Sequence, residues 1–169
     1  VGSGGLVVMN EDTCIVEVAR FFMNFTQNES CGKCVPCREG TKNMLKILRK
    51  IVNGHGEPED LDLLEELAKS VQDGSLCALG KTAPNPVLST LKYFRDEYIS
   101  HIKDKKCPAG VCAAMKKIEI DDSLCKGCTK CSRTCPVGAI EGTVKNPHKI
   151  DQTKCIKCGA CVDACPFKA

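Results

Sequence analysis

The sequence predicts a mostly α, α+β chain in two parts: a bundle of four helices and, after it, a small cysteine-rich unit. Between residues 10 and 104, apolar residues recur four times with the period of an amphipathic helix. Beyond residue 117, two similar cysteine runs follow each other at an offset of thirty residues. The first observation predicts the helices. The second predicts a repeat of strand, ligand loop, helix and strand.

The repeated run has the spacing C-x2-C-x2-C-x3-C-P in both copies. This spacing is typical of bacterial two-cluster ferredoxins, in which three thiolates hold one [4Fe–4S] cluster and the fourth reaches the other. Residues 118–169 are therefore expected to form a ferredoxin-like domain, with residues 118–120 as its first strand. The expected ligands are Cys125, Cys128, Cys131 and Cys165 for one cluster, and Cys135, Cys155, Cys158 and Cys161 for the other.

Four helices are expected over residues 10–104, the first from Asn10 or Asp12 through Phe25 and the others over about 38–52, 58–74 and 85–102. Short connections favour antiparallel neighbours, so an up-down bundle is predicted. The inward faces are expected to be formed by Ile15, Val18, Phe22 and Phe25 in the first helix, Met44, Leu45, Leu48 and Ile51 in the second, Leu61, Leu64, Leu67, Ala68 and Val71 in the third, and Val87, Leu91, Phe94, Tyr98 and Ile102 in the fourth.

A further cysteine triple lies between the first two helices. It has the spacing C-x2-C-x2-C without the following C-P, so a fourth thiolate must come from elsewhere. In an up-down bundle, the loop between helices one and two lies at the same end as the loop between helices three and four. The second loop contains a single cysteine. A third [4Fe–4S] cluster is therefore predicted on Cys31, Cys34, Cys37 and Cys77.

Three cysteines remain, one at the start of the first helix and two in the expected linker, residues 105–117. A histidine near the end of the fourth helix would lie at the same end of the bundle. Three thiolates and one imidazole form a closed structural zinc site. The prediction is Zn²⁺ on Cys14, His101, Cys107 and Cys112, which would pin the linker. The alternative is a core Cys14, a solvated cationic His101 and two cysteines that bind nothing.

Composition restricts the function. A net charge of +3 with 4% aromatic residues does not indicate nucleic-acid binding, and no apolar stretch reaches the roughly 18 residues of a membrane span. The odd count of 15 cysteines favours metal ligation in a reducing compartment, expected to be the cytoplasm, over disulfides. No catalytic constellation is apparent, and His55 and His148, in polar loops, are expected at the surface.

The bundle motifs resemble a known family. Residues 29–41, ESCGKCVPCREGT, and 75–80, SLCALG, are similar to the flavin-bearing NADH-oxidising subunit of complex I. The added ferredoxin-like unit, which that subunit lacks, resembles the beta subunit of NAD-linked, electron-bifurcating [FeFe] hydrogenases and the related subunit of NADP-reducing hydrogenases. The resemblance implies that FMN and NAD(H) bind upstream, that residues 1–9 end a preceding domain, and that the bundle cluster is the first electron acceptor from the flavin.

The predicted function is electron transfer within a multisubunit, NAD-linked hydrogenase, between the flavin, three clusters and ferredoxin or partner subunits. One alternative is the diaphorase subunit of an NAD(P)-dependent formate dehydrogenase or of a non-bifurcating hydrogenase. Another is an assembly module that docks subunits and conducts nothing. Because Ala169 aligns with Ala139, where a strand should begin, the sequence is expected to be a piece of a longer polypeptide.

Overall fold

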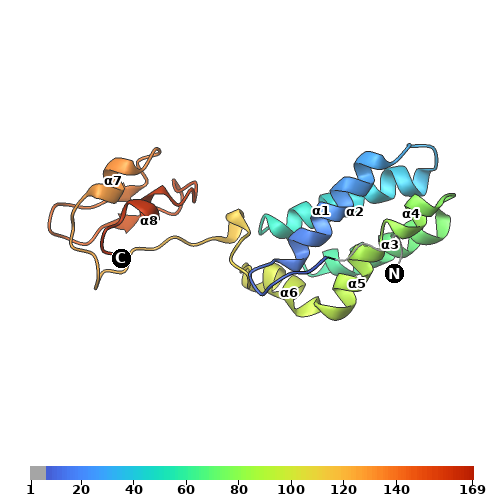
Figure 1. The fold of residues 1–169 in the computed structure, drawn as a ribbon, viewed down its shortest axis with the longest axis horizontal. Helices are drawn as coiled ribbons and strands as arrows, with labels where there is room; N and C mark the ends of the chain where they lie inside the picture. Colours follow the sequence, from blue (N-terminus) through green and yellow to red (C-terminus); the bar gives the residue numbers. More distant parts are fainter. Residues whose placement is uncertain (1–6) are drawn as a thin grey trace. The chain divides into compact units, whose positions relative to one another are not determined.

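The computed structural model describes residues 7–169. The chain forms two compact units, with the boundary between Lys116 and Lys117 (Figure 1). The first unit is helical, and the second combines two short helices with a two-stranded sheet. The predicted mostly α, α+β fold is therefore confirmed.

The first unit is a bundle in which α2 packs against α1 and α3, and α5 packs against the same two helices. Figure 1 shows the α1–α2 connection and α4 at the same end of this unit. The helices and helical turns are α1 (Ile15–Glu29), α2 (Val35–Val52), α3 (Glu59–Gly74), α4 (Ala78–Thr82), α5 (Asn85–Tyr93), α6 (Arg95–Ile99), a π-helical turn (Ser100–Asp104) and a 3-10 turn (Ala113–Met115).

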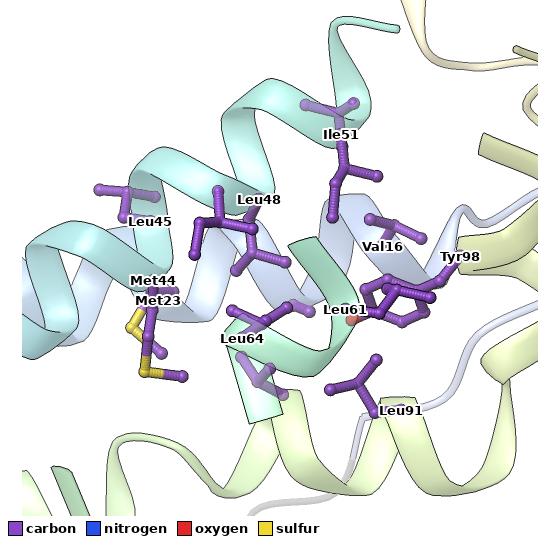
Figure 2. Close-up of a cluster of buried hydrophobic side chains, with 14 of the residues drawn as sticks. Val16, Met23, Met44, Leu45, Leu48, Ile51, Leu61, Leu64, Leu91 and Tyr98 are labelled. Atoms are coloured by element: carbon purple, nitrogen blue, oxygen red, sulfur yellow. The ribbon is translucent and has the colours of Figure 1, made fainter. Parts of the chain in front are cut away.

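The core of the bundle consists of aliphatic side chains and methionines from these helices. Figure 2 shows Met23, Leu48 and Leu64 converging between α1, α2 and α3, and all three are fully buried. At Gly40 a Cβ atom would overlap the Val71 side chain, so glycine allows α2 and α3 to approach closely. This packing fixes the positions of both ends of the bundle, where the cysteines of the first unit lie.

The predicted inward face of α1 is partly wrong. Ile15 is buried as expected, but the core face continues through Val16, Ala19 and Met23. Phe25 is 57% exposed. Because α1 carries apolar residues on more than one side, the hydrophobic period predicts the helix but does not determine which side faces the core.

The predicted fourth helix is broken. It ends at Tyr93, and Phe94, which was expected in the core, is 45% exposed with φ −131° and ψ 34°. The Tyr98 hydroxyl lies 2.8 Å from the Thr90 hydroxyl, although residues eight apart in a continuous helix are about 12 Å apart along the axis. The break therefore lets Tyr98 stay buried with its hydroxyl satisfied. The short helix α4 was not predicted.

The second unit carries the repeat. Strands β1 (Ile140–Glu141) and β2 (Lys149–Ile150) pair antiparallel, with Ile140 opposite Ile150, and one short helix lies in each half, α7 (Lys130–Thr134) and α8 (Ala160–Ala164). The strand expected over 118–120 is absent from the described secondary structure.

The N-terminal expectations fall partly outside the described residues. The segment expected to end a preceding domain, residues 1–9, lies outside the described residues up to residue 6, and residues 7–9 form no regular secondary structure. Within residues 7–169, no helix combines the length and the apolar character needed to cross a membrane.

Candidate metal centres

The cysteine triple lies at the turn from α1 into α2. Cys34 is the residue before α2 and Cys37 lies in its first turn, with Pro36 at a position where a missing N–H costs no helical hydrogen bond. Gly32 has φ +73°, and its carbonyl oxygen accepts a hydrogen bond from Arg38 Nη1 at 2.6 Å. This tight turn gathers three thiols at the N-terminus of a helix, where backbone N–H groups are free for an anion.

The loop between α3 and α4 lies against this triple. The backbone N–H of Leu76 donates to the Cys34 sulfur and lowers the pKa of that thiol, and the Cys37 N–H adds to the effect. A Cβ atom at Gly80 would overlap Ser75 and would lie 3.2 Å from Cys37 Cβ. The structure therefore brings the segment that contains Cys77 to the triple, as the up-down connectivity predicts (Figure 1).

These residues fit an anionic iron–sulfur cluster. Cys77 and Cys31 are exposed, whereas Cys37 is buried. The Ser75 hydroxyl is buried and has no close hydrogen-bond partner in the described part of the chain; Cys34 is the thiol beside it. Thiolates with N–H and O–H donors around them match the hydrogen bonding that tunes such clusters.

The second unit contains two cavities lined by cysteines. Cys161 and the side chains of Ile118 and Ile150 border both of them. Cys125, Cys128, Cys131 and Cys165 lie around one cavity, and Cys135, Cys155 and Cys158 lie around the other.

Burial and backbone N–H groups act in opposite directions on these thiols. Burial raises the pKa of Cys131 and of Cys161. The Ala139 N–H lies 3.3 Å from Cys135 Sγ and lowers the pKa of that thiol, and the Ala169 N–H does the same for Cys165 at 3.4 Å. Each half of the repeat therefore supplies one thiolate stabilised by the backbone that follows it. In both halves this is the fourth cysteine of the run, which in two-cluster ferredoxins binds the other cluster.

The ligand loops repeat in backbone conformation as well as in sequence. Left-handed residues occur in pairs thirty apart, namely Gly127 and Lys157, Thr129 and Gly159, and Gly138 and Lys168. Non-glycine residues rarely adopt positive φ, so each pair marks a place where the loop must turn sharply. The two loops have one geometry although their sequences differ.

Gly127 gives a direct test of this loop geometry. A Cβ atom there would lie 2.5 Å from the Asn146 backbone nitrogen and 2.6 Å from its carbonyl oxygen, whereas nothing lies within 4 Å of one at Gly138, which has nearly the same φ. Gly127→Ala should therefore lower the iron content of this unit after anaerobic reconstitution at least several-fold more than Gly138→Ala. Iron assays on both variants check this; equal losses would show that backbone strain alone matters.

At the other end of the bundle, three segments meet in a buried quartet. Cys14 precedes α1, His101 lies in the π-helical turn, and Cys107 and Cys112 follow it, and their ligand atoms all lie within 4.8 Å of one another. The alternative of a solvated His101 is wrong, because the residue is fully buried.

The spacing among Cys14, His101 and Cys112 is that of three ligands of a tetrahedral zinc site. Bond lengths of about 2.3 Å to sulfur and about 2.0 Å to nitrogen place two sulfurs about 3.8 Å apart, and a sulfur and a nitrogen about 3.5 Å apart. The Cys14 and Cys112 sulfurs are 3.7 Å apart, and His101 Nε2 lies 3.3 and 3.5 Å from them. His101 Nδ1 lies 2.7 Å from the Glu97 carbonyl oxygen, so Nδ1 donates and Nε2 is left for a metal.

The charges in the quartet also suit a cation. The Cys112 thiol and then His101 hydrogen-bond to Cys14 and lower the pKa of its thiol to about 4, although burial opposes this. Burial alone would lower the pKa of His101, but the hydrogen bonds to Cys14 and to the Glu97 carbonyl oxygen, with the charges of the nearby thiolates, together outweigh burial and raise this pKa to about 9. The hydrogen bond that the Cys112 thiol donates to Cys14, and then burial and the charge of Cys14, raise the pKa of Cys112 well above its ordinary value. A metal ion would remove this competition, because it accepts several thiolates together.

Of the two histidines expected at the surface, His55 is exposed as predicted. The prediction for His148 is wrong: it is 1% exposed. Its ring lies over Gly142, where a Cβ atom would be 2.6 Å from ring carbon Cγ. A polar loop sequence does not reveal this, because the space for the ring comes from a glycine in a neighbouring segment.

The two units together define an iron–sulfur protein. Residues 17–101 match the family described as the NADH-ubiquinone oxidoreductase-F iron-sulfur binding region, and residues 117–166 match a 4Fe-4S dicluster domain. The chain therefore belongs to the first of these families and carries a dicluster domain after it. These two matches confirm that both parts of the chain belong to [4Fe–4S]-binding families, as the cysteine spacing predicts.

Relatives are found among hydrogenases and complex I proteins. NADP-reducing hydrogenase subunit HndC of Solidesulfovibrio fructosivorans is 54% identical over 87% of this chain, which spans 30% of that relative. The F 2 subunit of NADH-quinone oxidoreductase of Rhizobium meliloti is 45% identical over 63% of the chain and 25% of its own length. A crystal structure of NAD+-reducing [NiFe]-hydrogenase in the H2-reduced state matches 57% of the chain and 17% of its own chain, with a TM-score of 0.55 and 31% identity.

Proposed function

We propose that this chain is the electron-transfer section of an NAD-linked, electron-bifurcating hydrogenase. The observation that carries the proposal is the grouping of twelve cysteines into the Cys77 site and two cysteine-lined cavities, each with the donor set of a [4Fe–4S] cluster. The match to a hydrogenase subunit extends over 87% of the chain, which favours a hydrogenase over a formate dehydrogenase.

In this proposal, Cys31, Cys34, Cys37 and Cys77 hold one cluster, Cys125, Cys128, Cys131 and Cys165 a second, and Cys135, Cys155, Cys158 and Cys161 a third. Each cluster would supply a one-electron carrier at its position. The protein holds the thiolates, limits solvent with apolar side chains, and places N–H donors near the sulfurs, which favours the more negative reduced state.

The partners are proposed on the same basis. FMN and NAD(H) would bind in the part of the polypeptide that precedes this chain, and the bundle cluster would take electrons from the flavin. Ferredoxin and other subunits of a cytoplasmic hydrogenase complex would exchange electrons with the clusters of the second unit. The name of the 54% identical relative supports a hydrogenase as the context.

The buried quartet is proposed to hold Zn²⁺ on Cys14, His101, Cys107 and Cys112. Its near-tetrahedral spacing and the free Nε2 of His101 support this assignment. The ion would tie the start of α1, the π-helical turn and residues 105–117 together. Its role would be structural, because four protein ligands leave no position open for a substrate.

The complete enzyme tests the conducting role. It is reduced anaerobically with NADH or with hydrogen, frozen within the turnover time, and followed by electron paramagnetic resonance. Reduction of the two clusters of residues 117–169 supports the proposal. If both stay oxidised while dithionite reduces them, the second unit is a docking module.

Bifurcation is tested in the same preparation by supplying acceptors singly and together. Hydrogen oxidation that needs NAD+ and ferredoxin at the same time supports a bifurcating enzyme. Equal rates with NAD+ alone contradict bifurcation and leave a simple NAD-linked hydrogenase.

A further inference from the structure

The two cavities of the second unit differ at one position of the repeat. His148 lines the cavity of Cys125, Cys128, Cys131 and Cys165. Thirty residues earlier, Ile118 is its counterpart, and it borders both cavities. A polar ring therefore borders the first site, and the second site has no histidine among its lining residues.

The His148 ring is held in place on two sides. Nδ1 lies 3.1 Å from the carbonyl oxygen of Asn146, and Gly142 leaves space for the ring. Asn146 is itself packed onto Gly127, and the adjacent Lys145 N–H donates to the Gly127 carbonyl oxygen at 3.1 Å. The ring is thus attached to the ligand loop that contains Cys125 and Cys128.

The other ring nitrogen, Nε2, is buried and lacks a hydrogen bond within the described part of the chain. A buried polar nitrogen without a partner costs about 1–3 kcal/mol, so a partner outside the polypeptide is expected. The group that belongs in the adjoining cavity is sulfur-rich and anionic, and it can accept a hydrogen bond but not donate one.

We propose that His148 Nε2–H donates a hydrogen bond to the cluster held by Cys125, Cys128, Cys131 and Cys165, and that it makes this cluster the preferred electron site of the pair. Because Nδ1 also donates to the Asn146 carbonyl oxygen, the ring then carries a hydrogen on both nitrogens. Hydrogen bonds to cluster sulfurs favour the reduced state and raise the potential. Ile118, the counterpart of His148 in the repeat, offers neither cluster such a bond.

The redox consequence is a one-electron equilibrium within the unit. One electron leaves the cluster of Cys135, Cys155, Cys158 and Cys161 and reduces the cluster beside His148, with no bond made or broken. His148 is a positioning residue in this equilibrium, because it holds no iron and carries no electron. The inference rests on the proposed function, since it needs both clusters in place.

Two variants of the complete polypeptide test the inference after anaerobic reconstitution. His148→Ile places at this position the residue found at its counterpart, and His148→Gln keeps an N–H donor. In redox titrations followed by paramagnetic resonance, His148→Ile should shift the electron distribution about tenfold toward the second cluster, which is about 59 mV for one electron. His148→Gln should shift it less.

A spectroscopic measurement on the unaltered sequence does not depend on how the variants fold. His148 is the only histidine in residues 117–169. With ¹⁵N-histidine labelling, pulsed paramagnetic resonance should detect nitrogen coupled to one reduced ferredoxin-type cluster, and the coupling should vanish in His148→Gln. Absent coupling, or unchanged potentials in His148→Ile, with about eight irons bound to this unit overturns the inference alone. Fewer irons before any substitution overturn the proposed function with it.

Discussion

Cys77→Ala should remove the bundle cluster and leave the two clusters of the second unit in place. The triple Cys31, Cys34 and Cys37 can supply only three thiolates, and Cys77 is the thiol that the α3–α4 loop brings to them. We expect the variant to lose about four of about twelve irons per chain. In the complete enzyme, NADH should then fail to reduce the remaining clusters, because the cluster that we propose as the first acceptor from the flavin is gone.

Leu76→Ala is the matched control for this variant. Leu76 is 78% exposed, and its contribution to the site is the backbone N–H that faces Cys34, which the substitution keeps. Iron content and NADH-driven reduction should stay within the error of the unaltered enzyme. If Cys77→Ala also kept its full iron content and its rate, a different residue would hold the fourth position and the assignment of Cys77 would be wrong.

Cys112→Ala should release the zinc ion and destabilise one end of the bundle. Its sulfur lies 3.7 Å from Cys14 and 3.5 Å from His101 Nε2, so the substitution removes one of four closely spaced ligands. Structural zinc contributes about 10–16 kcal/mol in small zinc domains, and we expect the loss of one ligand to cost at least about 3 kcal/mol of local stability. Hydrogen exchange should accelerate at the start of α1 and in residues 100–115.

Val111→Ala is the control here, because Val111 is the neighbouring residue and is 46% exposed. This variant should retain one zinc per chain, and its hydrogen exchange should be unchanged. X-ray absorption at the zinc edge of the unaltered protein should give three sulfurs and one nitrogen. A zinc content that does not change in Cys112→Ala, or a different ligand shell, rules out the quartet as a zinc site.

The proximity of the cysteine-bearing segments was predictable from sequence because cluster chemistry imposes fixed spacing on short loops. The C-x2-C-x2-C runs aim three sulfurs at one point, and the up-down connection of the helices brings Cys77 to the first run. Cys14 and His101 were predictable for the same topological reason. In each case a rule about loops or helix ends carries the prediction, and no detail of side-chain packing is needed.

The errors have a different origin. The rotation of α1, which exposes Phe25, depends on how Ala19 and Met23 pack against other helices. The break at Phe94 depends on a hydrogen bond between Tyr98 and Thr90 that forms only after the chain bends. His148 is buried because Gly142 leaves room for its ring. Such tertiary contacts override the local pattern, and they cannot be inferred from a single sequence.

Counting iron, acid-labile sulfide and zinc on the complete polypeptide and on its Cys77→Ala variant tests the central claim most directly. Anaerobic purification and reconstitution should give about twelve irons and about twelve sulfides from residues 7–169, beyond those held by any other part, together with one zinc. The variant should lose about four irons and keep the zinc. A total well below twelve irons, or a variant with undiminished iron, would contradict three clusters held by twelve cysteines.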